Sequence, residues 1–165
     1  MSVAPQEGRP EAIAELVGAL QSAGLRYELV HHDRTETAGA EAAALGVPRR
    51  QVAKTLVLRT EDGFARVVIP ASERLDVRKA REWLGGSKEI RLATEEELAG
   101  AYPDFELGAV PPFGGPKGDR VLVDRRLAEL DEVLFEAGTH QDSLRVPAKA
   151  VVEMTHSDVV DLVAE

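Results

Sequence analysis

The sequence predicts a single α/β (α+β) domain with about six to seven strands and surrounding helices. Segments with helical periodicity alternate with strand-like apolar runs along the chain, a pattern typical of a mixed fold. No internal repeat or low-complexity tract interrupts them. A length of 165 residues with 44% hydrophobic content is sufficient for one sizeable core. We therefore expect residues 1–165 to form one domain, with residues 1–8 flexible.

The composition excludes several classes of protein. No apolar run approaches the roughly 20 residues that cross a bilayer, and no signal-peptide pattern opens the chain. We therefore expect a cytoplasmic protein without membrane contact. The absence of cysteine excludes disulfides and thiolate metal sites. A formal charge of −9 argues against a surface that coats nucleic acid, whereas cations near residues 49–59 and 74–81 leave room for a local basic patch.

The first half of the chain contains five predicted elements. Apolar residues at helical spacing lie between Pro10 and Gly24, which indicates a helix. The alanine-rich stretch "TAGAEAAAL" begins at Thr37, a capping residue type, and ends before a Gly-Val-Pro sequence. An Asp-Gly pair at residues 62–63 separates two apolar runs and predicts a β-hairpin. The expected elements are helices over residues 10–23 and 37–45 and strands over residues 27–30, 51–60 and 64–70.

The second half combines regular elements with one long loop. Thr94 and Glu97 match the capping-box pattern that begins a helix. Residues 103–119 hold so many glycines and prolines that no regular element is expected there, and long loops in compact domains are often functional. The expected elements are helices over residues 76–84, from residue 94 and over 147–154, strands over 88–92, 120–123, 132–136 and 143–146, and an apolar tail at 159–163.

A lysine near the start of the predicted strand "QVAKTLVLRT" is the first candidate for chemistry. Side chains alternate across a strand, so Lys54 shares a face with Leu56 and Leu58. One interpretation is a surface lysine that extends from the strand end into water. The other is a cation held in a cleft to bind a carbonyl, phosphate or carboxylate group.

Two further segments are candidates for a binding site. The segment "GAVPPFGG" begins at Gly108 and includes Pro112 and Phe113; it is either a pocket wall with preset amide donors or a rigid surface turn. In "AGTHQDSL", Gly138 opens a tight turn that carries His140, which is either exposed or at a pocket rim. The spacing of the four histidines does not suit a metal site. No G-x-S-x-G motif, cysteine nucleophile or P-loop is present.

Three motifs in order resemble the YbaK/prolyl-tRNA-synthetase-associated family of aminoacyl-tRNA editing domains. They are "HHDRTETAGAEAAALGVPRRQVAKTLVLR", "GAVPPFGG" and "EAGTHQDSLRV", and the similarity runs from about Tyr27 to the C-terminus. The resemblance implies an α/β domain with a mixed, barrel-like sheet. It also implies that the domain needs no cofactor or metal. The implied functional residues are Lys54, Gly108 and His140 in catalysis and Thr37, Thr55, Pro112, Phe113 and Gly138 in substrate binding.

The resemblance further implies an activity. Members hydrolyse the ester between a wrong amino acid and its transfer RNA, so we expect a free-standing deacylase that acts in trans on tRNA-Pro carrying a small amino acid such as alanine or cysteine. The expected partners are the acceptor end of the misacylated tRNA and, as a further candidate, prolyl-tRNA synthetase, with the protein a monomer or weak homodimer. Some members carry tyrosine where this chain has Ala38, which leaves the amino acid open. Two alternatives stay open. One is a non-catalytic module that binds aminoacyl-tRNA or a synthetase, and the other is a small-molecule hydrolase.

Overall fold

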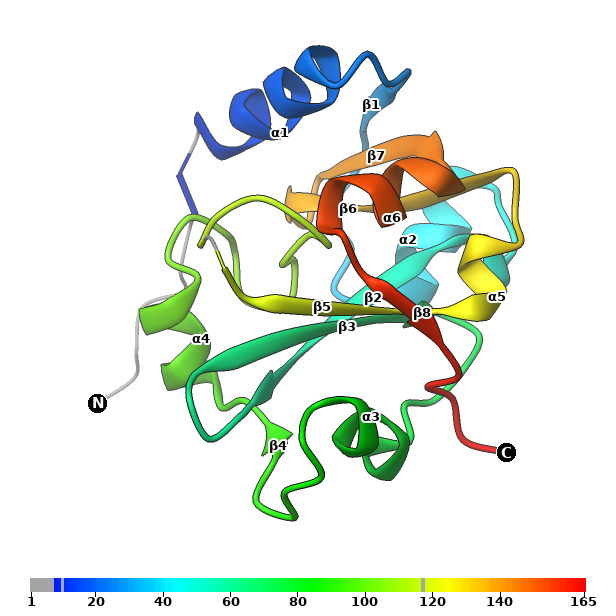
Figure 1. Cartoon of the computed structure of the whole chain (residues 1–165). Helices are drawn as coiled ribbons and strands as arrows, with labels where there is room; N and C mark the ends of the chain where they lie inside the picture. The colour runs from blue at the N-terminus through cyan, green and yellow to red at the C-terminus, as the bar shows by residue number, and fades with distance from the viewer. Residues whose placement is uncertain (1–7, 10, 117) are drawn as a thin grey trace.

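Figure 1 shows the computed structural model of the chain, which describes residues 8–9, 11–116 and 118–165. The expectation of a flexible segment over residues 1–8 falls, apart from Gly8, outside these residues. Among the described residues, no helix is both long enough and apolar enough to cross a membrane.

The strands form two sheets with helices around them. The larger sheet has the order β4-β2-β3-β5-β8 and contains both parallel and antiparallel pairs, and the smaller sheet has the antiparallel order β1-β7-β6. The strands are β1 (Glu28–His31), β2 (Ala53–Arg59), β3 (Phe64–Pro70), β4 (Arg91–Leu92), β5 (Arg120–Asp124), β6 (Glu132–Thr139), β7 (Asp142–Pro147) and β8 (Asp158–Val160). The helices are α1 (Glu11–Ser22), α2 (Ala38–Leu45), the 3-10 helix η1 (Arg49–Gln51), α3 (Val77–Trp83), α4 (Glu95–Ala101), α5 (Arg125–Ala128) and α6 (Ala148–Thr155).

The mixed fold is confirmed, but the sheet does not close into a barrel. Among the residues that the structure describes, a single isolated parallel bridge, between Val52 and Leu134, connects the two sheets at the start of β2. Closure would require a continuous ladder between β2 and β6, and these strands instead separate after the bridge. The barrel-like sheet expected from the family resemblance is therefore wrong in this detail.

Local sequence signals explain most of the elements. The Asp-Gly pair lies in the connection of the predicted hairpin, in which Ala53 pairs with Pro70 and Arg59 with Phe64. Thr94 and Glu97 form the expected capping box of α4. Two expectations need correction: the strand over 88–92 is limited to β4, and the short helix α5 was not expected. Four residues are too few for a periodic signal, and α5 depends on the Asp124 side chain, which accepts a hydrogen bond from Arg126 N.

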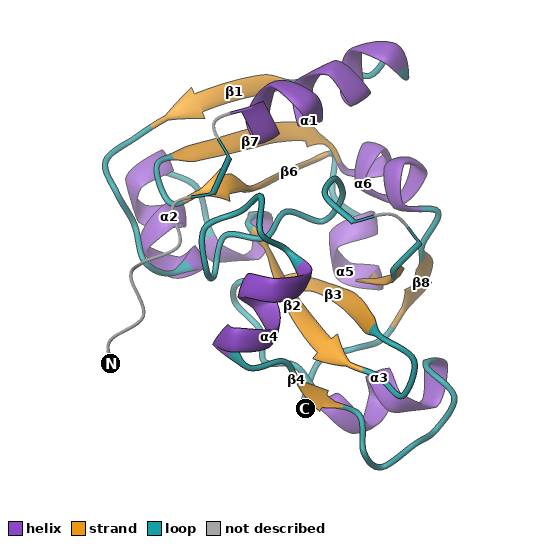
Figure 2. Ribbon diagram, turned by 90° about the vertical axis from the view of Figure 1, so that its left-hand side faces the viewer, coloured by secondary structure: helices purple, strands orange, loops and turns teal. Residues whose placement is uncertain are grey.

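The main hydrophobic core lies between the two sheets. Val68 and Val123 of the larger sheet pack in one cluster with Phe135 and Leu144 of the smaller sheet. Helix α1 contributes Leu16 to this cluster. Figure 2 shows the smaller sheet above and the larger sheet below, with α3 on the far side of the larger sheet. A second cluster, which includes Leu58, Ile69 and Ala80, fills the space under α3. Both faces of the larger sheet are therefore covered by packed side chains, and its uncovered backbone lies at strand edges.

Candidate active site

A pocket of about 320 Å³ lies where β2 and β6 separate. At one end the Val52–Leu134 bridge joins the strands, and at the other the Ala93 amide donates to the Val57 carbonyl. Strand β4 pairs with β2 only at Leu58 and Arg59, so the intervening edge of β2 is open. The pocket is lined by Ala38, Glu41, Ala53, Lys54, Thr55, Leu56, Val57, Leu92, Ala93, Leu98, Gly108, Val110 and Glu136. Consecutive residues of β2 line it because the pocket follows the strand edge rather than one face.

Lys54 is held in this pocket without a counter-ion. It lies two residues beyond the bridge, on the face it shares with Leu56 and Leu58, which pack in the cluster under α3. No described carboxylate forms an ion pair with its ammonium group. Burial, together with the positive charge of Arg74, lowers the pKa of Lys54. A half-buried, unpaired cation at a pocket is a candidate group for binding an anion.

The loop over residues 103–119 is fixed by a buried arginine that sequence reasoning did not single out. Arg66 of β3 is 1% exposed. Its guanidinium donates to Asp119 Oδ2 at 2.6 Å, to the Pro111 carbonyl at 2.8 Å and to the Gly114 carbonyl at 2.6 Å. The Tyr102 hydroxyl donates to the same Asp119 carboxylate at 2.8 Å. A rigid planar fork of donors suits this bridging role, and the loop that carries Gly108 is thereby preorganised.

Gly108 brings a free amide to the pocket. Its φ of +82° lies in the left-handed region that favours glycine, and a Cβ at this position would lie 3.4 Å from His140 Cε1. Its N–H donates to no residue that the structure describes. A backbone amide without a partner beside an unpaired lysine can polarise a carbonyl oxygen.

His140 lies behind the loop rather than at the pocket rim. It is 3% exposed, its Nε2 donates to the Leu107 carbonyl at 2.6 Å, and its backbone N–H donates to Glu106 Oε2 at 2.7 Å. Its Nδ1 lies 2.9 Å from Glu136 Oε2. The Glu136 carboxylate raises the pKa of His140 to about 9. His140 is therefore an imidazolium at neutral pH, and it fixes the backbone immediately before Gly108.

Two buried carboxyl groups also line the pocket. Glu41 of α2 is fully buried, and Glu136 of β6 is 8% exposed. The Ser143 hydroxyl donates to Glu41 Oε2, and His32 Nε2 lies 2.8 Å from the same hydroxyl. Glu41 Oε1 has no hydrogen-bond partner among the described residues. Burial raises the pKa of Glu41 to about 8 and also raises the pKa of Glu136.

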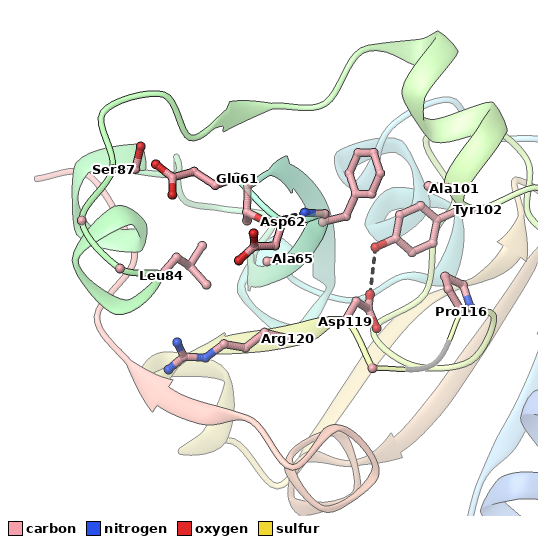
Figure 3. A pocket seen from close by; sticks show the side chains of 16 residues that line it. Glu61, Asp62, Ala65, Leu84, Ser87, Ala101, Tyr102, Pro116, Asp119 and Arg120 are labelled. Carbon is pink, nitrogen blue, oxygen red and sulfur yellow. Dashed lines mark hydrogen bonds between the residues drawn. The ribbon is translucent and has the colours of Figure 1, made fainter.

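A larger groove of about 740 Å³ lies elsewhere, beside the turn between β2 and β3 (Figure 3). Its polar lining includes the carboxylates of Glu61, Asp62 and Asp119. Its cation, Arg120, already pairs with Asp158 at 2.7 Å. An anionic ligand would meet unfavourable charge there, so the smaller pocket with Lys54 is the better candidate site despite its size.

Comparison with known proteins identifies the family. A family model for the aminoacyl-tRNA editing domain matches residues 32–154. The chain belongs to this family. The resemblance of the three sequence motifs is thereby confirmed, and an aminoacyl-tRNA editing role is supported.

Relatives and solved structures extend this result. Over 106 residues the editing domain is 31% identical to a proline–tRNA ligase of Halalkalibacterium halodurans. The alignment covers 64% of this chain and 18% of the ligase. Over 91 residues it is 31% identical to the proline–tRNA ligase of Thermosipho melanesiensis, with 55% and 15% covered. The chain thus spans less than a fifth of these relatives. A crystal structure of a candidate trans-editing enzyme for prolyl tRNA synthetase superposes with a TM-score of 0.80 at 29% identity, covering 99% of this chain and 100% of that one.

The predicted site residues of the editing domain divide into two groups. Lys54, Thr55 and Gly108 line the pocket, and Thr55 Oγ1 is buried without a hydrogen-bond partner among the described residues. The other residues surround it. Thr37 is the exposed N-cap of α2, where its hydroxyl accepts from Ala40 N at 3.0 Å, directly before the pocket residue Ala38.

The remaining three expected substrate contacts lie away from the pocket lining. Pro112 is buried, and Phe113 packs in the main core against Phe135, with ring centroids 5.6 Å apart. Gly138 has a φ of +92°, lies in a bulge of β6, and a Cβ there would lie 2.7 Å from the Phe105 ring. Pro112 and Phe113 line a separate pocket of about 660 Å³, and none of the three residues lines the pocket that holds Lys54.

Sequence reasoning missed Glu41 and Glu136 as pocket residues. Glu41 stands alone in an alanine-rich helix, and a single carboxylate in such a helix resembles a solvent-facing residue. Its burial depends on Ser143, which lies about a hundred residues further along the chain, so no local pattern indicates it. For Glu136, the available signal was a charged residue inside an apolar strand run.

Proposed function

We propose that this editing domain is a deacylase that acts in trans on misacylated tRNA-Pro carrying a small amino acid such as alanine or cysteine. The observation that supports it most strongly is the convergence of Lys54 and the free amide of Gly108 on one pocket. These two groups come from segments more than fifty residues apart, and both lack a partner among the described residues.

The chemistry follows from what these groups can bind. The Lys54 ammonium binds the terminal adenosine phosphate or the ester region and holds the aminoacyl end in place. The Gly108 N–H donates to the ester carbonyl and stabilises the oxyanion that forms when water adds to it. The bond from the acyl carbon to the ribose oxygen then breaks, and that oxygen takes the proton that water loses. The neighbouring ribose hydroxyl assists the water, and His140 acts as a positioning residue for Gly108.

The pocket favours a small acyl group. Its volume of about 320 Å³ is near the lower end of the usual range for ligand sites, roughly 300–1,000 Å³. Val57, Leu98 and Val110 supply apolar walls. An apolar wall excludes a larger side chain by steric clash, whereas a missing methylene changes binding by only about 1–3 kcal/mol. Alanine and cysteine are therefore favoured over larger amino acids.

The acceptor end of the tRNA is the partner that the charge distribution suits. Arg49, Arg50 and Arg74 form no side-chain ion pair with any residue the structure describes. Arg49 lies over the first turn of α2, 3.2 Å from a Cβ placed on Gly39, and Arg74 is close enough to lower the pKa of Lys54. Unpaired arginines near the pocket suit phosphate contacts, whereas the net charge of −9 disfavours a wide tRNA footprint. We place the reaction in the cytoplasm, with prolyl-tRNA synthetase as a further partner.

Deacylation of a panel of tRNAs tests this function. Native protein is mixed with tRNA-Pro charged with alanine, cysteine, serine or proline, and release of the amino acid is followed beside Lys54→Ala and Lys88→Ala. Lys88 is an exposed lysine outside the pocket, which makes it a matched control. We expect rapid release of a small wrong amino acid, a loss of about 100-fold or more in Lys54→Ala and no change in Lys88→Ala. Equal rates for native protein and Lys54→Ala would remove Lys54 from the mechanism, and binding without hydrolysis would indicate a non-catalytic module.

A further inference from the structure

We propose that Glu41 and Glu136 form a receptor for the free α-ammonium group of the aminoacyl ester. This inference rests on the proposed function and adds a requirement to it: the substrate must carry an unblocked amine. The ligand class is thereby narrowed from acyl esters in general to aminoacyl esters, and N-blocked or peptidyl esters are excluded.

The position of the two carboxyl groups supports this assignment. Lys54 and Glu136 each lie two residues beyond the Val52–Leu134 bridge, on β2 and β6 respectively. The gap between the separating strands therefore has a cation on one strand and a carboxylate on the other, yet the two do not form an ion pair. Glu41 joins the carboxylate side from α2. A ligand with one cationic and one anionic end fits such a pocket.

The hydrogen bonding of Glu41 is incomplete in a way that points to a ligand. Its Oε2 accepts from Ser143, which fixes the carboxyl group, while Oε1 is buried with no partner among the described residues. Buried polar atoms nearly always have partners, and charged side chains are rarely fully buried unless paired. An ammonium group has three donors and would satisfy this oxygen. The raised pKa of Glu41, about 8, agrees with a group that lacks a cation in the free protein and would ionise beside one.

Glu136 has different surroundings from Glu41 as a group that binds the α-ammonium. The Nδ1 atom of His140 lies 2.9 Å from Glu136 Oε2. Burial raises the pKa of Glu136, and the charge of His140 opposes this shift. Glu136 therefore faces the pocket beside a cationic partner, and a bound ammonium group would add to the charge that favours its carboxylate. The α-ammonium of an aminoacyl ester is two bonds from the ester carbonyl carbon, so a receptor on the same pocket as the Gly108 amide would orient that carbonyl.

Binding of non-hydrolysable analogues tests the receptor independently of catalysis. The probes are adenosines that carry at the 3′ position an amide-linked alanyl, propionyl or N-acetylalanyl group; propionyl has the size of alanyl without the amine. Dissociation constants are measured by NMR titration for native protein, Glu41→Gln, Glu136→Gln and Glu132→Gln. Glu132 lies on β6 like Glu136, but outside the pocket, where it pairs with Arg26 and Arg145. Glu132→Gln is therefore the matched control.

We expect native protein and Glu132→Gln to bind the alanyl probe at least 10-fold more tightly than the propionyl probe. In Glu41→Gln and Glu136→Gln this ratio should fall to within about twofold of one, with the affinity for propionyl little changed. A native protein that binds the two probes equally, or a ratio that survives in both glutamine variants, overturns the receptor. Hydrolysis of alanyl-tRNA and N-acetylalanyl-tRNA at equal rates overturns it too, but leaves the deacylase intact. Amine-dependent binding without any hydrolysis supports the receptor and overturns the deacylase.

Discussion

Replacement of the buried Arg66 tests how strongly this side chain holds the loop that carries Gly108. In Arg66→Met the aliphatic bulk is retained while all donors are lost. The Asp119 carboxylate loses its ion-pair partner, and the carbonyls of Pro111 and Gly114 each lose a charge-assisted hydrogen bond. The change therefore removes the bridge between β3 and the second half of the loop without creating a large cavity.

The expected cost follows from the burial of these groups. Removal of one partner from a fully buried ion pair costs about 3–5 kcal/mol. The Asp119 side chain is 12% exposed and keeps the Tyr102 hydroxyl as a donor, which places the loss at the lower end of this range. We expect the free energy of unfolding to fall by about 3 kcal/mol, a large part of the about 5–15 kcal/mol typical of a domain.

Urea unfolding at pH 7 measures this loss, with Arg91→Met as the control. Arg91 forms an exposed ion pair with Glu97 at 2.7 Å, and such pairs contribute about 0–1 kcal/mol. Deacylation by Arg66→Met should also fall by about 10-fold or more, at a temperature where the variant remains folded, because the amide of Gly108 loses its fixed position. A loss of stability no greater than that of Arg91→Met would refute the bridging role.

Three further predictions concern the pocket. Gly108→Ala is strained at a φ of +82° and should lose about 1–2 kcal/mol of stability and most deacylation. The control Gly18→Ala in α1 has open space at its Cβ and should gain about 0.5–1 kcal/mol in the same unfolding assay. Equal changes in the stability of the two variants would contradict the strain at Gly108. Lys54→Met removes a cation whose pKa is lowered by burial, a penalty present at every pH below the folded pKa. Its stability at pH 7 should therefore match or exceed that of native protein within about 0.5 kcal/mol while deacylation is lost, and a large destabilisation would show a structural role. The folded pKa of Glu41, about 8, exceeds its ordinary value of 4.5, so the stability of native protein should fall as the pH rises between these values. Glu41→Gln should remove that decline and be more stable than native protein by about 2 kcal/mol or more at pH 9. Parallel pH profiles of stability for the two proteins would contradict the raised pKa of Glu41.

Local signals in the sequence predict most of the elements of this fold. The Asp-Gly pair indicates the hairpin of β2 and β3, and the Thr94 capping box begins α4 as expected. Helix α5 and the shortness of β4 were not predictable, because neither a four-residue helix nor a two-residue strand has enough residues to show a period. The failure of the sheet to close depends on how two distant strands separate, and no local pattern reports it.

The site was predictable only in part for a related reason. Lys54 interrupts an apolar strand and Gly108 precedes a proline-rich turn, so both are visible in sequence. Pro112 and Phe113 share that turn, but apolar side chains beside a glycine loop can face a ligand or the core. Here Phe113 packs in the core, and both residues lie outside the lining of the pocket with Lys54. Glu41 becomes a pocket residue only when Ser143 of β7 lies against α2.

A crystal structure of the protein with the 3′-alanyl amide analogue of adenosine would test the location of the site most directly. We predict that the acyl group lies in the gap between β2 and β6, with its carbonyl oxygen accepting from Gly108 N–H and the nucleoside extending toward Lys54. An analogue bound in the groove beside the β2–β3 turn, or one whose carbonyl is out of reach of that amide, would contradict the assignment.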